Sequence, residues 1–212
     1  MIRFVGSIIY FSGLIFAEIL RLPRRISRIR EHRGRGSIRA PYRVSELCVI
    51  TSILLGIWVL PIIYTMTNWL RAFDYSLSPW MMWAALPVFI IGLAIRWKAQ
   101  QTLAKQWSFT LETLDCHRLV KSGIYSYTRH PIYVSLILWA MAQPLLLQNF
   151  IAGLGGVISV ILIWAIRVPL EEEMMIETFG EEYRQYMAHT GRFFSKKQDK
   201  IEPNGDIGNR KF

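Results

Sequence analysis

The stretch YSYTRHPIY, which ends at Tyr133, places charged and aromatic side chains where a polar loop meets an almost wholly apolar run. Pro131 is expected to be the first helical residue, because the amide hydrogen that proline lacks has no intrahelical acceptor there. The free amides of such a first turn attract anions. These residue types therefore indicate a polar site, with His130 and Tyr133 beside a helix start, at the boundary of a membrane.

A second polar group, RVPLEEE from Arg167 to Glu173, follows the next apolar run. Only Gln148-Asn149 separates that run from the one that begins at Pro131, so we expect the two to form a tight antiparallel helical hairpin. The hairpin would bring the RHP sequence close to Arg167 and the glutamates. A competing interpretation is that Arg167 only reaches the interface and helps to set the topology.

The two helix ends have opposite electrostatic preferences. A helix start favours negative charge, and a helix end favours positive charge. S-adenosyl-L-methionine carries groups of both signs, so it is a suitable ligand. Its carboxylate could lie against the amides after His130, while Glu171 or Glu172 could meet its ammonium, sulfonium or ribose hydroxyls.

The apolar runs predict how these motifs are positioned. Runs of roughly the 20 residues that a bilayer requires predict five transmembrane helices, at about 2–20, 45–66, 79–97, 131–148 and 150–169. The fold is therefore expected to be an all-α integral membrane protein with cytoplasmic cofactor-binding loops. Its expected divisions are three N-terminal helices in 1–97, a core that carries the site in 98–195 and a flexible tail in 196–212.

The formal charge of +10 is concentrated in one segment. Nine arginines and one acid lie in the predicted loop 21–44, between two apolar runs. This pattern is typical of a positive-inside loop, so we expect membrane lipids as partners and no nucleic acid. With that loop in the cytoplasm, five crossings put the N-terminus outside and the C-terminus and the site inside.

The remaining chemistry-bearing residues do not form a recognisable site. Cys48 and Cys116 have no metal-ligand spacing, and no two of the four histidines lie four positions apart, so neither a metal nor a disulfide is predicted. A dinucleotide-binding Gly-x-Gly-x-x-Gly, a phosphate loop and a Gly-x-Ser-x-Gly elbow are absent from the sequence. Any cofactor must then bind to the helix ends and their loops.

Two segments together resemble a known family. The run HRLVKSGIYSYTRHPIYVSL, followed after the hairpin by RVPLEEEMMIETFGEEYRQYMAHTGRFF, is similar to the cofactor-binding core of the membrane isoprenylcysteine carboxyl methyltransferases and their prokaryotic relatives. The resemblance covers about residues 106–195. It depends on the paired RHPxY and EE elements and on Phe179-Gly180, Tyr183 and Tyr186.

The resemblance implies a role for individual residues. Arg167 would bind the carboxylate of the acceptor, and Glu112 would match a further polar cofactor contact upstream only if the loop here is shorter than in the family. The S-adenosyl-L-methionine contacts that the family implies are His117, Arg118, Leu119, Val120, Tyr125, His130, Pro131, Ile132, Tyr133 and Glu171.

The implied reaction is an in-line methyl transfer, which requires alignment and water exclusion. A lipophilic or lipidated acceptor with a prenylcysteine-like carboxylate needs no base, and Arg167 would orient it. A phospholipid amine or a thiol would have to lose a proton, with Glu172 or His130 as the nearest candidates. Two interpretations of other classes stay open: a non-catalytic membrane protein that docks lipids or a partner, and a sterol reductase that uses a nicotinamide.

Overall fold

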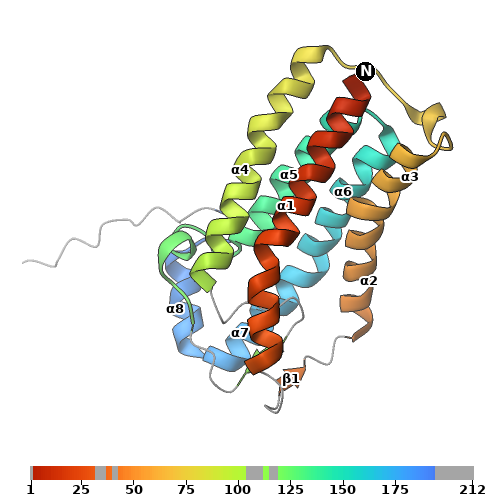
Figure 1. Cartoon of the computed structure of the whole chain (residues 1–212). Coiled ribbons are helices and arrows are strands. Elements are labelled where there is room, and N and C mark those ends of the chain that lie inside the picture. The colour runs from red at the N-terminus through yellow and green to blue at the C-terminus, as the bar shows by residue number, and fades with distance from the viewer. Residues whose placement is uncertain (1, 32–36, 40–42, 104–111, 115–118, 194–212) are drawn as a thin grey trace, which may run out of the picture.

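The computed structural model describes residues 2–31, 37–39, 43–103, 112–114 and 119–193, which form an elongated helical bundle (Figure 1). In chain order the elements are α1 (Ile2–Glu31), β1 (Ser37–Arg39), α2 (Arg43–Ile53), the π-helical η1 (Leu54–Val59), α3 (Leu60–Met66), the 3-10 turn η2 (Arg71–Phe73), α4 (Pro79–Leu103), β2 (Glu112–Leu114), the 3-10 turn η4 (Gly123–Ser126), α5 (Pro131–Leu147), α6 (Phe150–Leu162), the π-helical η5 (Ile163–Arg167), α7 (Val168–Phe179) and α8 (Glu181–His189).

Among the described residues, three continuous helical stretches are long and apolar enough to cross a bilayer: Val44–Met66, Pro79–Leu103 and Phe150–Phe179. The apolar part of α1, Phe4–Ile19, and helix α5 are shorter. Many large apolar side chains on these helices are exposed, as expected where lipid surrounds a helix. The chain is therefore a multi-pass membrane protein, and five crossings remain a prediction.

Two helix boundaries differ from those expected. Helix α1 does not end near residue 20 but continues to Glu31, so the first part of the predicted loop 21–44 is helical. Arginine is a good helix former, and positive charge near a helix C-terminus stabilises the helix. The helix that begins at Phe150 likewise continues beyond residue 169, through η5 and α7, to Phe179.

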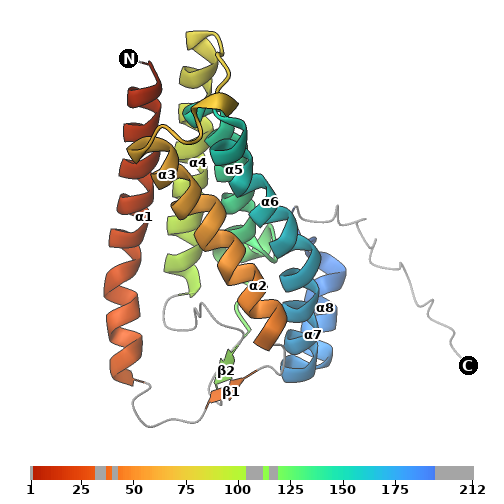
Figure 2. The same ribbon diagram turned by 90° about the vertical axis from the view of Figure 1, so that its right-hand side faces the viewer.

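Strands β1 and β2 form a short antiparallel pair with Ile38 opposite Thr113, which the all-α prediction did not include. Each strand has three residues, and alternation over so short a run cannot be recognised as a strand pattern. The pair connects the segment after α1 to the segment after α4, at the same end of the bundle as α7 (Figure 2).

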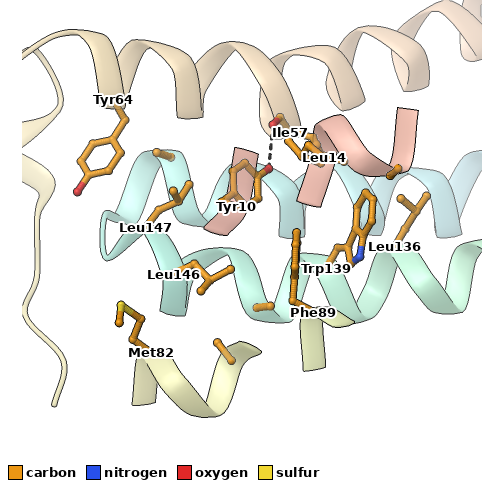
Figure 3. Close-up of a cluster of buried hydrophobic side chains, with 14 of the residues drawn as sticks. Tyr10, Leu14, Ile57, Tyr64, Met82, Phe89, Leu136, Trp139, Leu146 and Leu147 are labelled. Atoms are coloured by element: carbon orange, nitrogen blue, oxygen red, sulfur yellow. Dashed lines mark hydrogen bonds between the residues drawn. The ribbon is translucent and has the colours of Figure 1, made fainter. Parts of the chain in front are cut away.

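One buried core holds the helices together (Figure 3). Trp139 of α5 stacks on Phe89 of α4, with ring centroids 5.4 Å apart. Tyr10 of α1 donates a hydrogen bond of 2.8 Å to the carbonyl oxygen of Ile57 in η1. The core residues come from both sides of residue 97, so the N-terminal helices and the helices of the predicted site pack as one bundle.

Helices α5 and α6 are joined by two residues, Gln148 and Asn149, and pack against each other. Gln148 adopts the left-handed conformation, with a φ of 51°. Asn149 caps α6, because its side-chain oxygen accepts hydrogen bonds from the amides of Ile151 and Ala152 at 3.1 and 2.9 Å. This turn reverses the chain and returns it toward the start of α5.

Candidate functional site

The charged centre of the site is Glu172 on α7, which is 4% exposed. Its carboxylate accepts hydrogen bonds from Arg129 Nη2 at 2.8 Å and from Arg192 Nη2 at 2.7 Å. Nε2 of His130 lies 3.1 Å from the same carboxylate. A buried carboxylate is stable only when it is paired in this way. Glu172 therefore connects the start of α5, helix α7 and the segment after α8.

A second polar chain lies next to the first. The Tyr133 hydroxyl donates a hydrogen bond to Oε2 of Glu171 and accepts one from Nε of Arg167 at 3.0 Å. Nη1 of Arg167 also lies 3.9 Å from Oε1 of Glu46 on α2, an ion pair that is longer than a hydrogen bond. Arg167 is 9% exposed, so its guanidinium lies inside the bundle and not at its surface.

A π-helical turn that ends at Arg167 changes the direction of the side chains that follow it. Arg167 is the last residue of η5, and Pro169 lies in the first turn of α7. Proline cannot donate the hydrogen bond of a regular α-helix, and a π-turn is one way for a helix to pass such a position. Because a π-turn holds more residues than an α-turn, it changes the helix face on which Glu171 and Glu172 lie.

Buried tyrosines surround the charged groups. The Tyr186 hydroxyl donates a hydrogen bond of 2.5 Å to the carbonyl oxygen of Tyr125, and the rings of Tyr183 and Tyr186 meet edge to face at 5.9 Å. Burial raises the pKa of all three phenols, and the charge of Glu171 adds to the increase in the pKa of Tyr125. These hydroxyls stay neutral and can serve as hydrogen-bond donors.

The start of α5 is less open to an anion than the sequence suggests. The amides of Tyr133 and Val134 donate to the carbonyl of His130, each at 3.0 Å, and the amide of His130 donates to the Thr128 hydroxyl at 3.2 Å. Another donor lies nearby, because Nε of Arg129 is buried with no hydrogen-bond partner among the described residues. A ligand anion could satisfy that nitrogen.

The structure brings most of the predicted site residues together through these contacts. They are Tyr125, His130, Tyr133, Arg167, Glu171 and Glu172, with Pro131 and Ile132 in the same helical turn. Leu119 and Val120 are half-buried before η4, and their contact with a cofactor stays a prediction. His117, Arg118 and the tail 196–212 lie outside the described residues, as does the side chain of Glu112, whose backbone pairs with Arg39.

Two residues of the site were missed by the sequence reasoning. Arg192 lies in the final segment of the family resemblance, where no separate signal marked it. Glu46 lies at the start of a predicted membrane run, and an acid within such a run usually pairs with a base. That rule could have found Glu46. No group of three metal-ligating side chains lies close together in the described part of the chain.

Comparison with known proteins leads to the same region. The model of the isoprenylcysteine carboxyl methyltransferase family matches residues 84–177. The resemblance to this family is confirmed for that region. The matched range includes the RHPxY turn, Arg167 and the paired glutamates Glu171 and Glu172, and it ends before Arg192.

Curated proteins of this family show how far the similarity extends. Protein-S-isoprenylcysteine O-methyltransferase of Saccharomyces cerevisiae is 34% identical over 128 residues, which are 58% of this chain and 52% of the yeast protein. The human protein of the same name is 32% identical over 109 residues, 50% of this chain and 38% of its own length. This chain thus spans about half of the yeast protein and less of the human one.

A solved structure of a eukaryotic intramembrane Ras methyltransferase, an isoprenylcysteine carboxyl methyltransferase, also matches. It has a TM-score of 0.49 and 23% sequence identity, and the match covers 71% of this chain and 50% of that one.

Proposed function

We propose that this protein transfers a methyl group from S-adenosyl-L-methionine to a lipophilic acceptor at the membrane interface, namely the carboxylate of a prenylcysteine-like substrate. One observation carries the proposal. The RHPxY turn of α5 meets Arg167, Glu171 and Glu172 in a buried site, inside the range that matches the methyltransferase family. The curated relatives are named protein-S-isoprenylcysteine O-methyltransferases, and these names support the same substrate class.

The residues of the site fit the proposed methyl donor. Glu171 offers a carboxylate to an ammonium group or a ribose hydroxyl, and Nε of Arg129 offers a buried hydrogen to an anion. S-adenosyl-L-methionine, when bound, supplies a methyl group on a positively charged sulfur. The contacts proposed from the family pattern are Glu112, His117, Arg118, Leu119, Val120, Tyr125, His130, Pro131, Ile132 and Tyr133, with Glu171.

Arg167 is proposed to hold the acceptor. A planar guanidinium pairs with a carboxylate through two parallel hydrogen bonds, which fixes both position and orientation. The contact of Arg167 with Glu46 at 3.9 Å is one that an incoming carboxylate would compete for. Because a carboxylate is already ionised at neutral pH, the protein needs only to align it and to exclude water.

The environment of Glu172 supports a carboxylate acceptor over an amine or a thiol. An amine or a thiol has to lose a proton during transfer, so it needs a base with an available lone pair. Glu172 is surrounded by Arg129, His130 and Arg192. We therefore assign Glu172 to the organisation of the site and not to proton removal.

A cytoplasmic position is proposed for the site. The arginine-rich second half of α1 ends at the same end of the bundle as α7 (Figures 1 and 2), and clustered positive charge near a membrane helix marks the cytoplasmic side. Cysteines placed at position 30 and after Ser195 should react with an impermeant reagent from the same side of sealed vesicles. Labelling of the two positions from opposite sides would contradict this topology.

The function can be tested with radiolabelled S-adenosyl-L-methionine and protein in lipid nanodiscs. The acceptors are an S-farnesylcysteine with a free carboxylate, the same compound as its methyl ester, phosphatidylethanolamine and a small thiol. We expect base-labile label on the first compound and none on the ester. Transfer to the amine or the thiol alone would favour that alternative, and a protein that binds no donor would be a docking protein.

A further inference from the structure

The segment after α8 folds back over the RHP turn. We call Thr190–Phe193 the strap. The carbonyl oxygen of Gly191 accepts a hydrogen bond from the amide of Arg129 at 3.0 Å. The carbonyl oxygen of Arg192 accepts one from the Thr128 hydroxyl at 2.6 Å. These two bonds attach the strap to the residues directly before α5.

Side chains of the strap attach it to the long helix of the site. Phe193 stacks on Trp164 of η5, with ring centroids 4.3 Å apart and an interplanar angle of 20°. The guanidinium carbon of Arg192 lies 5.4 Å from the centre of the same ring, within the range of a cation–π contact. The strap therefore bridges the start of α5 and the η5–α7 helix, the two elements that form the site.

Arg192 contacts the carboxylate of Glu172 through two of its nitrogens. Its Nε and Nη2 donate to Oε2 of Glu172 at 3.0 and 2.7 Å. The other oxygen, Oε1, accepts from Nη2 of Arg129 and, at 3.2 Å, also from Nε of Arg192, and it lies beside Nε2 of His130. Because a planar guanidinium that bonds through two nitrogens restricts rotation of the carboxylate, it directs Oε1 toward the RHP turn.

We propose that Arg192 is a positioning residue that acts through Glu172 to hold the Arg129-His130 turn in the geometry that binds the methyl donor. The proposal rests on the proposed function for its kinetic readout. The side chain of Arg192 is 40% exposed, whereas those of Arg129 and Glu172 are 7% and 5% exposed. Arg192 is thus the accessible member of a buried cluster, so it can be replaced without opening a cavity in the core.

A purely structural role for Arg192 would appear as a lower melting temperature of the variant that lacks it. An ion pair with one exposed partner adds little to the stability of a fold, so we expect loss of Arg192 to change the melting temperature only slightly. A positioning role requires a specific loss at the donor end of the site. It predicts a higher KM for S-adenosyl-L-methionine with an unchanged KM for the acceptor.

The experiment compares Arg192→Ala, Arg192→Lys and the matched control Arg184→Ala, which changes an exposed arginine on α8. Two kinds of measurement are made on the full chain in nanodiscs: hydrogen exchange in a peptide that covers 128–134, and steady-state kinetics that give kcat and the two KM values. For Arg192→Ala we expect faster exchange and a donor KM raised roughly tenfold, the effect of about one charge-assisted hydrogen bond. Arg192→Lys should recover part of both, because one nitrogen can still reach the carboxylate, and Arg184→Ala should match the wild type.

Unchanged exchange in Arg192→Ala would overturn the proposal, because the strap would then not hold the turn. Faster exchange with an unchanged donor KM would also overturn it, since Arg192 would then only brace the fold. A wild-type protein that transfers no methyl group to any acceptor would refute the proposed function instead. In that case the exchange measurement still decides whether Arg192 holds the turn.

Discussion

The two ends of the bundle satisfy their buried polar groups in different ways. At the end that carries the N-terminus (Figure 1), Nδ2 of Asn149 donates to the carbonyl of Leu70 at 2.7 Å and to Asp74 at 2.9 Å. The Tyr75 hydroxyl donates to the carbonyl of Pro144 at 2.6 Å. At the opposite end, the carboxylate of one glutamate on α7 joins two arginines and a histidine from two other segments.

This difference shows which end is suited to a ligand. A hydrogen bond from a side chain to a backbone carbonyl closes a turn, and a ligand cannot replace it without moving the chain. Bonds between charged side chains can be exchanged for bonds to a ligand by rotation of the side chains alone. The end that carries the N-terminus therefore closes the α5–α6 connection. The opposite end, which we call the charged end, can bind and orient small molecules.

Glu172→Gln should have the largest effect on stability, because it leaves the buried Arg129 without its counter-charge. We expect the free energy of unfolding in detergent to fall by roughly 3–5 kcal/mol, the usual cost of breaking a buried ion pair. The control is Glu182→Gln, which removes an exposed pair with Lys121 and should cost less than about 1 kcal/mol. Equal losses in the two variants would show that the charged end is not held by its buried cluster.

Arg167→Lys should lower methyl transfer while fold and donor affinity are retained. Lysine keeps the positive charge but loses the planar pair of donors, and a misplaced acceptor costs on the order of 100-fold in rate. The matched control is Arg71→Lys at the opposite end of the bundle, which should be fully active. A lysine variant at position 167 with normal kcat and acceptor KM would restore the interpretation that Arg167 only helps to set the topology.

Glu171→Gln should weaken donor binding without unfolding the protein. If this carboxylate meets a charged or hydroxyl group of the donor, its neutralisation should cost roughly 1.5–3 kcal/mol of binding free energy. Calorimetric titration with S-adenosyl-L-methionine measures the loss, and the exposed Glu177→Gln on the same helix is the control. Unchanged affinity in a folded Glu171→Gln variant would remove Glu171 from the donor site.

Asn149→Ala should have the smallest effect and should act on stability alone. The variant loses the cap of α6 and the bonds to the connection before α4, which together cost about 1–2 kcal/mol of unfolding free energy. The exposed Asn68→Ala serves as its control. A change in donor KM in Asn149→Ala would mean that the two ends are coupled and do not have separate tasks.

The meeting of the RHPxY and EE elements could be predicted from the sequence, but their pairing could not. The helix ends alone allowed either Glu171 or Glu172 to meet the donor, and only the family resemblance assigned that contact to Glu171. In the structure Glu171 bonds Tyr133, and Glu172 faces Arg129. Neighbouring helical residues point in directions about 100° apart, so each takes a different partner. Which glutamate meets Tyr133 and which meets Arg129 depends on the phase of the helix, and the π-helical turn that ends at Arg167 changes that phase.

The sequence by itself determined the features that follow from local rules. Pro131 begins α5 because proline is suited to a helix start. Three of the apolar runs lie in helices whose length and composition are sufficient to cross a bilayer. Only the tertiary structure decided that Arg192 meets Glu172 and that Glu46 lies beside Arg167. Such contacts join residues whose distance depends on how whole helices and loops pack, and no local pattern records that packing.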